Sequence, residues 1–207
     1  MPIMHFLQKH LILIFVTAGL GVQISPALAR PLLETPVYNE ETQSYLEMID
    51  YRPTTGGYGL TWKKAIEVAE SRSLGGVRGR LAVIKSPQVD MFIRLNLRPP
   101  GATWFGLFYN CETRKLEWVT GEPLKPTDYG NFDVQNWYRG YNHHLCKHYM
   151  GFTRYPAYLD MKRDKRWAIT TPEKLYYYFI IEYPTGSRIE GDNIESIPAP
   201  RAPSSND

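Results

Sequence analysis

The stretch TWFGLFYNCETRKLEWVTGEP, residues 103–123, is the most patterned part of this sequence. Trp104 and Trp118 each stand in a short run of apolar and aromatic residues, which is typical of a β-strand. Cys111 lies between the two runs, and a Gly-Glu-Pro sequence follows the second. The stretch therefore predicts two strands joined through a connection that carries a cysteine, with a turn-rich segment after Pro123.

Two helices are predicted before this stretch, with a short strand between them. The first begins after Thr61, a suitable N-cap, and ends before Gly75. Its apolar residues recur at helical spacing: Trp62, Ala65, Ile66 and Ala69. The second begins with Ser-Pro at residues 86–87 and stops before Pro-Pro-Gly at residues 99–101. Between the helices, GRLAVIKS at residues 79–86 predicts a buried strand.

Every periodic segment from residue 103 onward resembles a strand. These segments are TWFGLFYN (103–110), KLEWVTG (115–121), HLCKHYMG (144–151), AYLDMKR (157–163) and LYYYFIIEY (175–183). Two helices followed by an antiparallel run of strands predict an α+β fold class.

The two ends of the chain differ from this central block. Residues 1–29 resemble a secretory signal peptide, because Lys9 precedes an apolar run and an A-x-A cleavage sequence ends the segment. An uncleaved membrane anchor is the alternative. We interpret residues 30–44 as a lead-in segment and residues 45–184 as one globular domain. Residues 185–207 are rich in proline and poor in aromatic residues, which predicts a solvated tail.

Composition argues against several classes of function. The formal net charge is +3, and loss of Lys9 with the leader would leave +2, far from the dense basic face that nucleic-acid binding favours. No later apolar run is long enough to span a bilayer. The sequence contains no G-x-S-x-G, phosphate-loop or H-E-x-x-H motif, so we expect a binding protein rather than an enzyme.

The chain has two cysteines, Cys111 and Cys146. Export favours oxidation, so a disulfide between them is the leading interpretation. Two free thiols or a metal site are the alternatives. His144, Cys146 and His148 would share one face of a strand, and with His143 they offer ligands that suit Zn²⁺, as in a small metal enzyme.

Taken in order, these motifs resemble a C-type lectin-like domain over nearly the whole central block. The matching elements are Trp62 and Ala65 in Trp-x-x-Ala; Gly79, Leu81, Ala82, Ile84 and Ser86 in Gly-x-Leu-Ala-x-Ile-x-Ser; Trp104, Phe105, Gly106 and Leu107 in Trp-Ile-Gly-Leu; Trp118, Gly121 and Pro123 in Trp-x-x-Gly-x-Pro; and Phe179, Ile180, Ile181 and Glu182 in the closing strand.

The resemblance implies structural roles for several of these residues. Trp104 and Trp118 are expected in the core, and Gly106 is expected where another segment passes closely. The family commonly joins its first helix to its last strand by a disulfide. Ala69 and Ile181 stand at the corresponding positions, so we expect an apolar contact there instead.

The resemblance also locates a calcium site, from which this sequence departs. Family members that bind sugar through Ca²⁺ use a Glu-Pro-Asn type triplet in the long loop, a Glu before a cysteine, and Trp-Asn-Asp on the next strand, because Ca²⁺ requires several converging oxygens. The loop PTDYGNFDVQNWYRG, residues 126–140, lacks the triplet, and His144 replaces the Glu. Asp160 alone remains of Trp-Asn-Asp. We therefore expect no cofactor, and no calcium site of the usual design.

The resemblance favours a secreted carbohydrate-binding module whose long loop, residues 126–141, contacts a glycan. Aromatic rings there suit stacking on sugars, and neighbouring amides and carboxylates suit hydrogen bonds. The predicted ligand-binding residues are Asn131, Asp133, Asn136, Trp137, Tyr138 and Asp160. The alternative is a calcium-independent module that binds a cell-surface or envelope protein through the same aromatic residues.

The disulfide interpretation makes a direct prediction. Thiol titration of the denatured, unreduced protein should detect no free thiol, because Cys111 and Cys146 are expected to be oxidised. Two reactive thiols would contradict it.

Overall fold

The computed structural model describes residues 35–132, 146, 151–161 and 166–191. The expected signal peptide lies outside these residues. So do most of the expected tail and most of the expected strand at 144–151, and their predictions stay predictions. Within the described residues, no helix combines the length and apolar character needed to cross a membrane.

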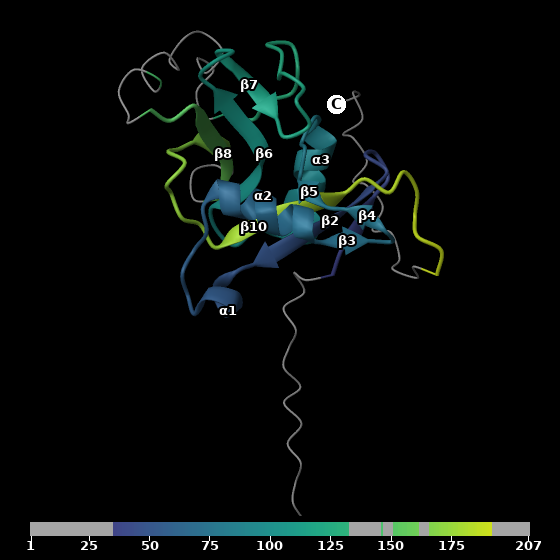
Figure 1. The fold of residues 1–207 in the computed structure, drawn as a ribbon. Helices are drawn as coiled ribbons and strands as arrows, with labels where there is room; N and C mark the ends of the chain where they lie inside the picture. Colours follow the sequence, from purple (N-terminus) through teal and green to yellow (C-terminus); the bar gives the residue numbers. More distant parts are fainter. Residues whose placement is uncertain (1–34, 133–145, 147–150, 162–165, 192–207) are drawn as a thin grey trace, which may run out of the picture.

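One large sheet organises the described chain (Figure 1). Its main path runs β1 (Val37–Asn39), β2 (Ser44–Asp50), β10 (Tyr178–Tyr183), β6 (Thr103–Asn110), β8 (Arg154–Asp160) and β9 (Arg166–Ile169). Two further strands pair beside this path, β5 (Arg80–Leu81) with β10 and β7 (Lys115–Trp118) with β6. The β10–β6 pair is parallel, and the other pairs are antiparallel. In Figure 1, α1 (Arg52–Thr55) and β7 lie at opposite ends of the molecule.

Both predicted helices form, and each begins at the predicted cap. Thr61 Oγ1 accepts a hydrogen bond from the Lys64 backbone N–H at the start of α2 (Trp62–Ser71). Ser86 Oγ accepts one from the Val89 N–H at the start of α3 (Pro87–Phe92). The second helix continues as a π-helical segment, η1 (Ile93–Leu97), before the prolines that end it. A short hairpin, β3 (Ser73–Leu74) and β4 (Val77–Arg78), follows α2.

Strand β6 is buried along its whole length, and its side chains alternate between two hydrophobic clusters. Trp104 and Phe108 belong to the cluster under α2, to which that helix contributes Trp62, Ala65 and Ala69. Phe105, Leu107 and Tyr109 belong to the larger cluster under α3 and η1. The predicted burial of Trp104 and Trp118 is confirmed, with 0% and 2% of their surfaces exposed.

Gly106 allows the backbone of Leu81 and Ala82 to approach β6 closely. A Cβ at this position would lie 2.7 Å from the Leu81 carbonyl oxygen and 2.9 Å from that of Ala82, closer than real Cβ atoms come. The Gly106 N–H donates to the Ala82 carbonyl, and its own carbonyl accepts from the Val119 N–H. The segment after β5 therefore binds β6 through its backbone, as the sequence predicted for this glycine.

The two residues at the positions where the resemblance would imply a disulfide, Ala69 and Ile181, are both fully buried. Ala69 of α2 and Ile181 of β10 belong to the same hydrophobic cluster. Gly79 lies between them, because a Cβ there would be 2.7 Å from both the Ala69 carbonyl oxygen and an Ile181 methyl carbon. Apolar contact thus occupies this part of the core.

Several predicted strand limits were wrong. The strand expected over 79–86 pairs only as β5, after which a single hydrogen bond joins the Ala82 N–H to the Ile180 carbonyl. The buried carboxylate of Glu182 then accepts from the Val83 N–H and the Arg80 side chain. β10 begins three residues later than expected, and β9 was not predicted.

The α+β class and the C-type lectin-like order of elements are confirmed. A first strand pair is followed by two capped helices, then by the strand pair with two tryptophans, and a closing strand returns to the centre of the sheet.

Replacing Trp104 tests the importance of the α2 cluster. Its indole N–H donates to the Leu60 carbonyl at 2.9 Å, and the centroids of its ring and the Tyr176 ring are 4.5 Å apart. Trp104→Ala should lower the free energy of unfolding by about 3–5 kcal/mol, measured by denaturant unfolding, because it creates a cavity in the core. Leu175→Ala is the control, since Leu175 is exposed. An equal effect of both variants would contradict the prediction.

Candidate functional site

Two of the predicted ligand-binding residues, Asn131 and Asp160, lie in the described structure. Asp133, Asn136, Trp137 and Tyr138 lie outside it and stay predictions. The described part of this region is the base of the long loop, which we define as residues 119–132 together with their contacts on α3, β7 and β9.

The loop leaves β7 along a fixed path. Pro123 forms a β-bridge with Glu117, and the Leu124 N–H donates to the Leu116 carbonyl. The Leu124 side chain is buried in the cluster under α3. Hydrogen bonds and apolar burial therefore hold the first residues of the loop against the sheet.

A buried carboxylate, Asp90 of α3, holds the next part of the base. The Arg94 guanidinium donates to both of its oxygens, at 2.9 and 3.1 Å. The Tyr129 hydroxyl and the Asn131 side-chain amide donate to Oδ2, at 2.9 and 3.0 Å. The Trp167 indole N–H is 3.4 Å from Oδ1. We call these five residues the Asp90 network.

The Asp90 network compensates the negative charge of a carboxylate that is almost completely buried. The Asp90 side chain is 5% exposed, and its ion-pair partner Arg94 is 15% exposed. Burial, together with the adjacent Asp90 carboxylate, raises the pKa of Tyr129 well above its ordinary value, so its hydroxyl keeps its proton at alkaline pH values where an ordinary tyrosine ionises. A buried carboxylate with several donors fixes the position of each one, and two of these donors, Tyr129 and Asn131, lie within residues 119–132.

Trp167 fixes the end of the described loop base. Its backbone N–H donates to the Asn131 carbonyl at 2.6 Å, and Phe132 forms a parallel bridge with it. Its fully buried ring makes edge contacts with the rings of Tyr129 and Phe132, with centroids 5.5 and 5.4 Å apart. Asn131 is therefore bonded into the base through both its side chain and its backbone.

The far end of the loop is fastened by a disulfide. Cys111, just after β6, is bonded to Cys146, with Cα atoms 5.7 Å apart, which confirms the predicted pairing. The Cys111 N–H also donates to the Thr153 carbonyl beside β8. Residues 133–145 therefore lie between two attachment points on the same framework, Phe132 and Cys146.

Asp160 lies on the α2 side of the sheet, whereas the Asp90 network lies on the α3 side. Its neighbour Leu159 belongs to the cluster under α3, so Asp160 shares the opposite face with Tyr158, which contacts the α2 cluster. Burial is the main cause of a raised pKa at Tyr176 on that side, and the charge of Asp160 adds to it. Asn131 points to Asp90 instead, so the structure does not bring these two predicted residues together.

The described residues contain no group of three or more His, Cys, Asp or Glu side chains that could hold a metal ion. His143, His144 and His148, the ligands of the alternative zinc site, lie outside the described residues. Cys146, their predicted partner, is in the disulfide and so is not a thiolate ligand.

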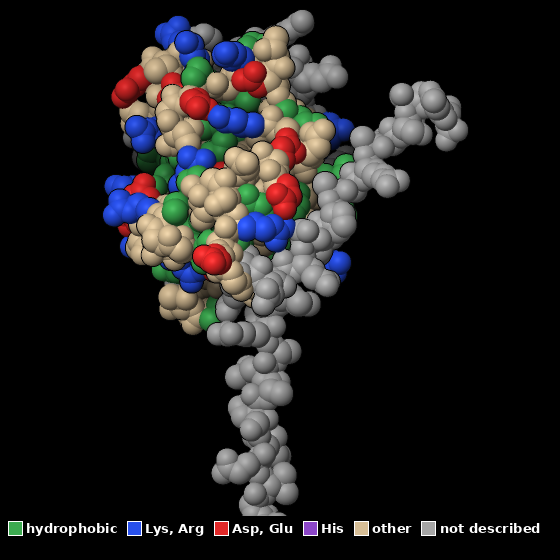
Figure 2. Space-filling model, turned by 90° about the vertical axis from the view of Figure 1, so that its right-hand side faces the viewer, with side chains coloured by type: hydrophobic (Ala, Val, Ile, Leu, Met, Phe, Trp, Pro, Cys, Tyr) green, Lys and Arg blue, Asp and Glu red, His purple; other side chains and the backbone are tan. Residues whose placement is uncertain are grey.

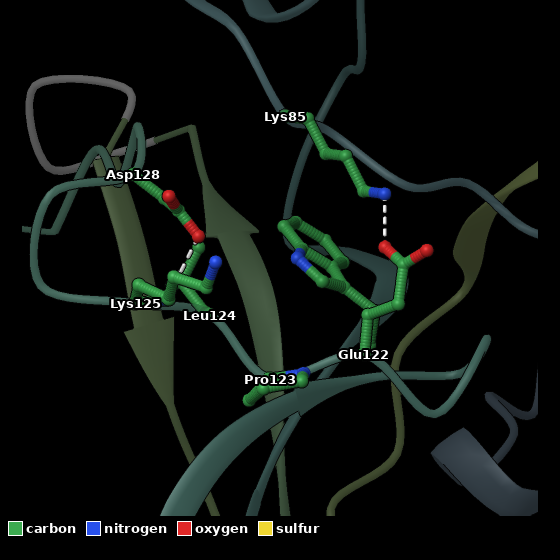
Figure 3. Close-up of a pocket in the computed structure, with 7 residues that line it drawn as sticks. Lys85, Glu122, Pro123, Leu124, Lys125 and Asp128 are labelled. Atoms are coloured by element: carbon green, nitrogen blue, oxygen red, sulfur yellow. Dashed lines mark hydrogen bonds and ion pairs between the residues drawn. The ribbon is translucent and has the colours of Figure 1, made fainter.

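A surface pocket opens beside the loop base. Its volume is about 440 Å³, and its lining residues are Lys85, Trp118, Glu122, Pro123, Leu124, Lys125 and Asp128. Figure 3 shows the Lys85 ammonium facing the Glu122 carboxylate on one side, with Lys125 and Asp128 opposite them. The Asp128 carboxylate accepts from the Lys125 backbone N–H at 2.8 Å, which fixes the turn that forms this wall.

Charges of both signs are also mixed elsewhere on the surface. On the face shown in Figure 2, Lys and Arg side chains are interspersed with Asp and Glu. That face therefore presents no extended basic area, in agreement with the small net charge of the sequence.

No family model matches the sequence, and no curated protein matches it. Among solved structures, the C-type lectin CEL-I from Cucumaria echinata is 13% identical with a TM-score of 0.48, over 68% of this chain and 89% of that one. The human scavenger receptor C-type lectin carbohydrate-recognition domain is 18% identical with a TM-score of 0.48, over 72% and 96%. A calcium-independent type II antifreeze protein is 17% identical with a TM-score of 0.46, over 68% and 85%. These likenesses concern the fold.

Sequence reasoning missed the Asp90 network and the pocket. Asp90 and Arg94 are four residues apart on a predicted helix, a spacing that indicates an ion pair but not its burial. Tyr129 and Asn131 were assigned to the exposed loop. The sequence carries no signal for their long-range bonds to α3.

Replacing Asp90 should loosen the loop base. Asp90→Ala leaves the Arg94 charge and three donors without their acceptor, so it should cost about 3–5 kcal/mol of unfolding free energy. Amide hydrogen exchange at Tyr129, Asn131 and Trp167 should accelerate more than exchange within α2. Glu67→Ala, which removes an exposed carboxylate, is the control and should change stability by less than about 0.5 kcal/mol. Unchanged exchange at the loop base would contradict this role.

Proposed function

We propose that this protein is an exported carbohydrate-binding module that contacts a glycan through its long loop, residues 126–141, without a calcium chelate. The proposal joins the C-type lectin-like fold to the chemistry of the loop. Fold alone does not define a function, and the support comes from the attachment of the loop and from the side chains that the loop carries.

The observation that carries the proposal is the attachment of the loop at both ends. The Asp90 network and Trp167 hold its beginning, and the disulfide between Cys111 and Cys146 holds its end. A binding segment whose ends are fixed loses less conformational entropy when it contacts a ligand. The described residues thus hold the chain at Phe132 and at Cys146, on either side of the positions where the sequence places most of its candidate ligand-binding groups.

The loop carries side chains suited to sugars. Trp137 and Tyr138 have flat rings that can stack on the apolar face of a pyranose, while Asp133 and Asn136 can exchange hydrogen bonds with its hydroxyls. The same aromatic residues would also suit a protein surface, which is the second class of partner predicted from the sequence.

Two observations support binding without calcium. The Asn131 amide nitrogen donates to Asp90, which places that side chain on the α3 side of the sheet, whereas Asp160 lies on the α2 side. A calcium chelate needs several oxygens converging on one point, and these two do not converge. The loop also lacks the Glu-Pro-Asn type triplet.

The proposal predicts the response to chelation and to loss of an aromatic side chain. In isothermal titration with glycans selected on an array, EDTA should leave the affinity nearly unchanged. Trp137→Ala should weaken it by about 1–3 kcal/mol, because the truncation removes a stacking anchor. A calcium lectin predicts the reverse, with binding lost in EDTA and in Asp160→Ala.

An array without any bound glycan, with or without calcium, would contradict the proposal. Retention of envelope proteins in a pull-down by the wild type, but not by Trp137→Ala, would then favour the protein-binding alternative.

A further inference from the structure

The pocket beside the loop base is a second candidate binding site, and the described residues define its walls. Its described lining residues are two lysines, two carboxylates and three apolar residues, and its volume of about 440 Å³ lies within the usual range for small-ligand sites, roughly 300–1,000 Å³. It involves none of the predicted ligand-binding residues. We propose that this pocket binds one uncharged pyranose ring, as a subsite of the glycan-binding function proposed above, on which this inference rests.

The charges of the pocket select against ionic ligands. Lys85 and Glu122 form an ion pair on one wall, with side chains 54% and 58% exposed. Lys125 and Asp128 stand on the opposite wall (Figure 3). An anion in the pocket would be attracted by both ammonium groups and repelled by both carboxylates, and a cation the reverse, so neither gains a net attraction that offsets the loss of its hydration. The balanced set therefore favours a ligand without net charge.

The same groups suit a ligand with several hydroxyls. An ammonium group has three hydrogen-bond donors, and a carboxylate has several lone pairs, so the Lys85–Glu122 pair retains capacity for further bonds. Within the part of the chain that the structure describes, the Lys125 ammonium makes no ion pair or side-chain hydrogen bond. A sugar hydroxyl both donates and accepts, so it can use ammonium and carboxylate groups together.

The remaining walls suit the C–H surface of a sugar ring. Pro123 is exposed, while the Leu124 and Trp118 side chains close the inner part of the pocket. Backbone bonds hold this wall, because the Trp118 N–H donates to the Glu122 carbonyl and the Leu124 N–H to the Leu116 carbonyl. The pocket is thus largely formed before a ligand arrives, and its loop-side wall continues into the long loop.

The test follows backbone amide shifts by NMR while the purified protein is titrated with methyl β-D-glucopyranoside, methyl β-D-galactopyranoside and methyl α-D-mannopyranoside. At least one should shift the amides of Glu122, Leu124 and Lys125. Glucuronate and glucosamine, which add a negative and a positive charge to the same ring, should shift them less. If none of the three glycosides moves these amides, or if a charged sugar binds more tightly than every neutral one, the proposal fails.

Matched variants identify the groups responsible. Glu122→Gln and Lys85→Met should each weaken glycoside binding by about five- to tenfold, the effect of losing one good hydrogen bond. Glu67→Gln and Lys64→Met alter an ion pair of similar exposure on α2, 51% for Glu67 and 55% for Lys64, and should leave binding unchanged. Equal effects of both pairs of variants would overturn the assignment.

Trp137→Ala separates this inference from the proposed loop function. If it abolishes binding of a longer glycan while single glycosides still shift the pocket amides, both proposals are supported. If the longer glycan depends on Trp137 but not on Glu122 or Lys85, the loop function stands and the pocket assignment fails. If glycan binding depends on Glu122 and Lys85 but not on Trp137, the pocket assignment stands and the loop proposal fails.

Discussion

The burial of strand β6 on both faces is the constraint on which the rest of the structure depends. A strand with no exposed side needs a cover on each, and α2 supplies one while α3 with η1 supplies the other. Gly106 adds a further requirement, because its missing Cβ admits the backbone after β5. That close approach places Lys85 and the cap of α3 near the end of β7, where the loop begins. The position of the candidate site therefore follows from the core.

The Asp90 network connects the core to the base of the long loop. The Asp90 carboxylate is 5% exposed, so it requires hydrogen-bond donors. A buried charge or polar group without a partner would lower the free energy of unfolding. Arg94 of the same helix supplies charge compensation, whereas Tyr129, Asn131 and Trp167 supply hydrogen bonds from elsewhere in the sequence. Each hydrogen bond to Asp90 also fixes the position of the side chain that donates it. The network thus serves stability and loop placement through the same contacts.

The loop base combines rigidity with mixed polarity. A buried ionic network and an aromatic cluster around Trp167 attach residues 119–132, a disulfide attaches the chain at Cys146, and the adjacent pocket has exposed charges of both signs. Rigid attachment limits the entropy lost on binding, and balanced charge favours uncharged polar ligands. Both properties suit recognition of sugars without a metal ion, and neither requires the oxygen set of a calcium lectin.

The two capped helices, the strand pair with Trp104 and Trp118, and the burial of these two rings could be predicted from the sequence. The caps at Thr61 and Ser86, the alternation in β6 and the glycine at 106 depend on short-range geometry, so they could be predicted along with the fold class and the disulfide. The burial of Asp90, the hydrogen bond that the Asn131 amide nitrogen donates to it, and the position of Asp160 on the α2 side of the sheet follow only from the tertiary structure. These facts depend on which segments meet across long sequence separations. Burial and side-chain direction arise at such meetings, and no local pattern encodes them.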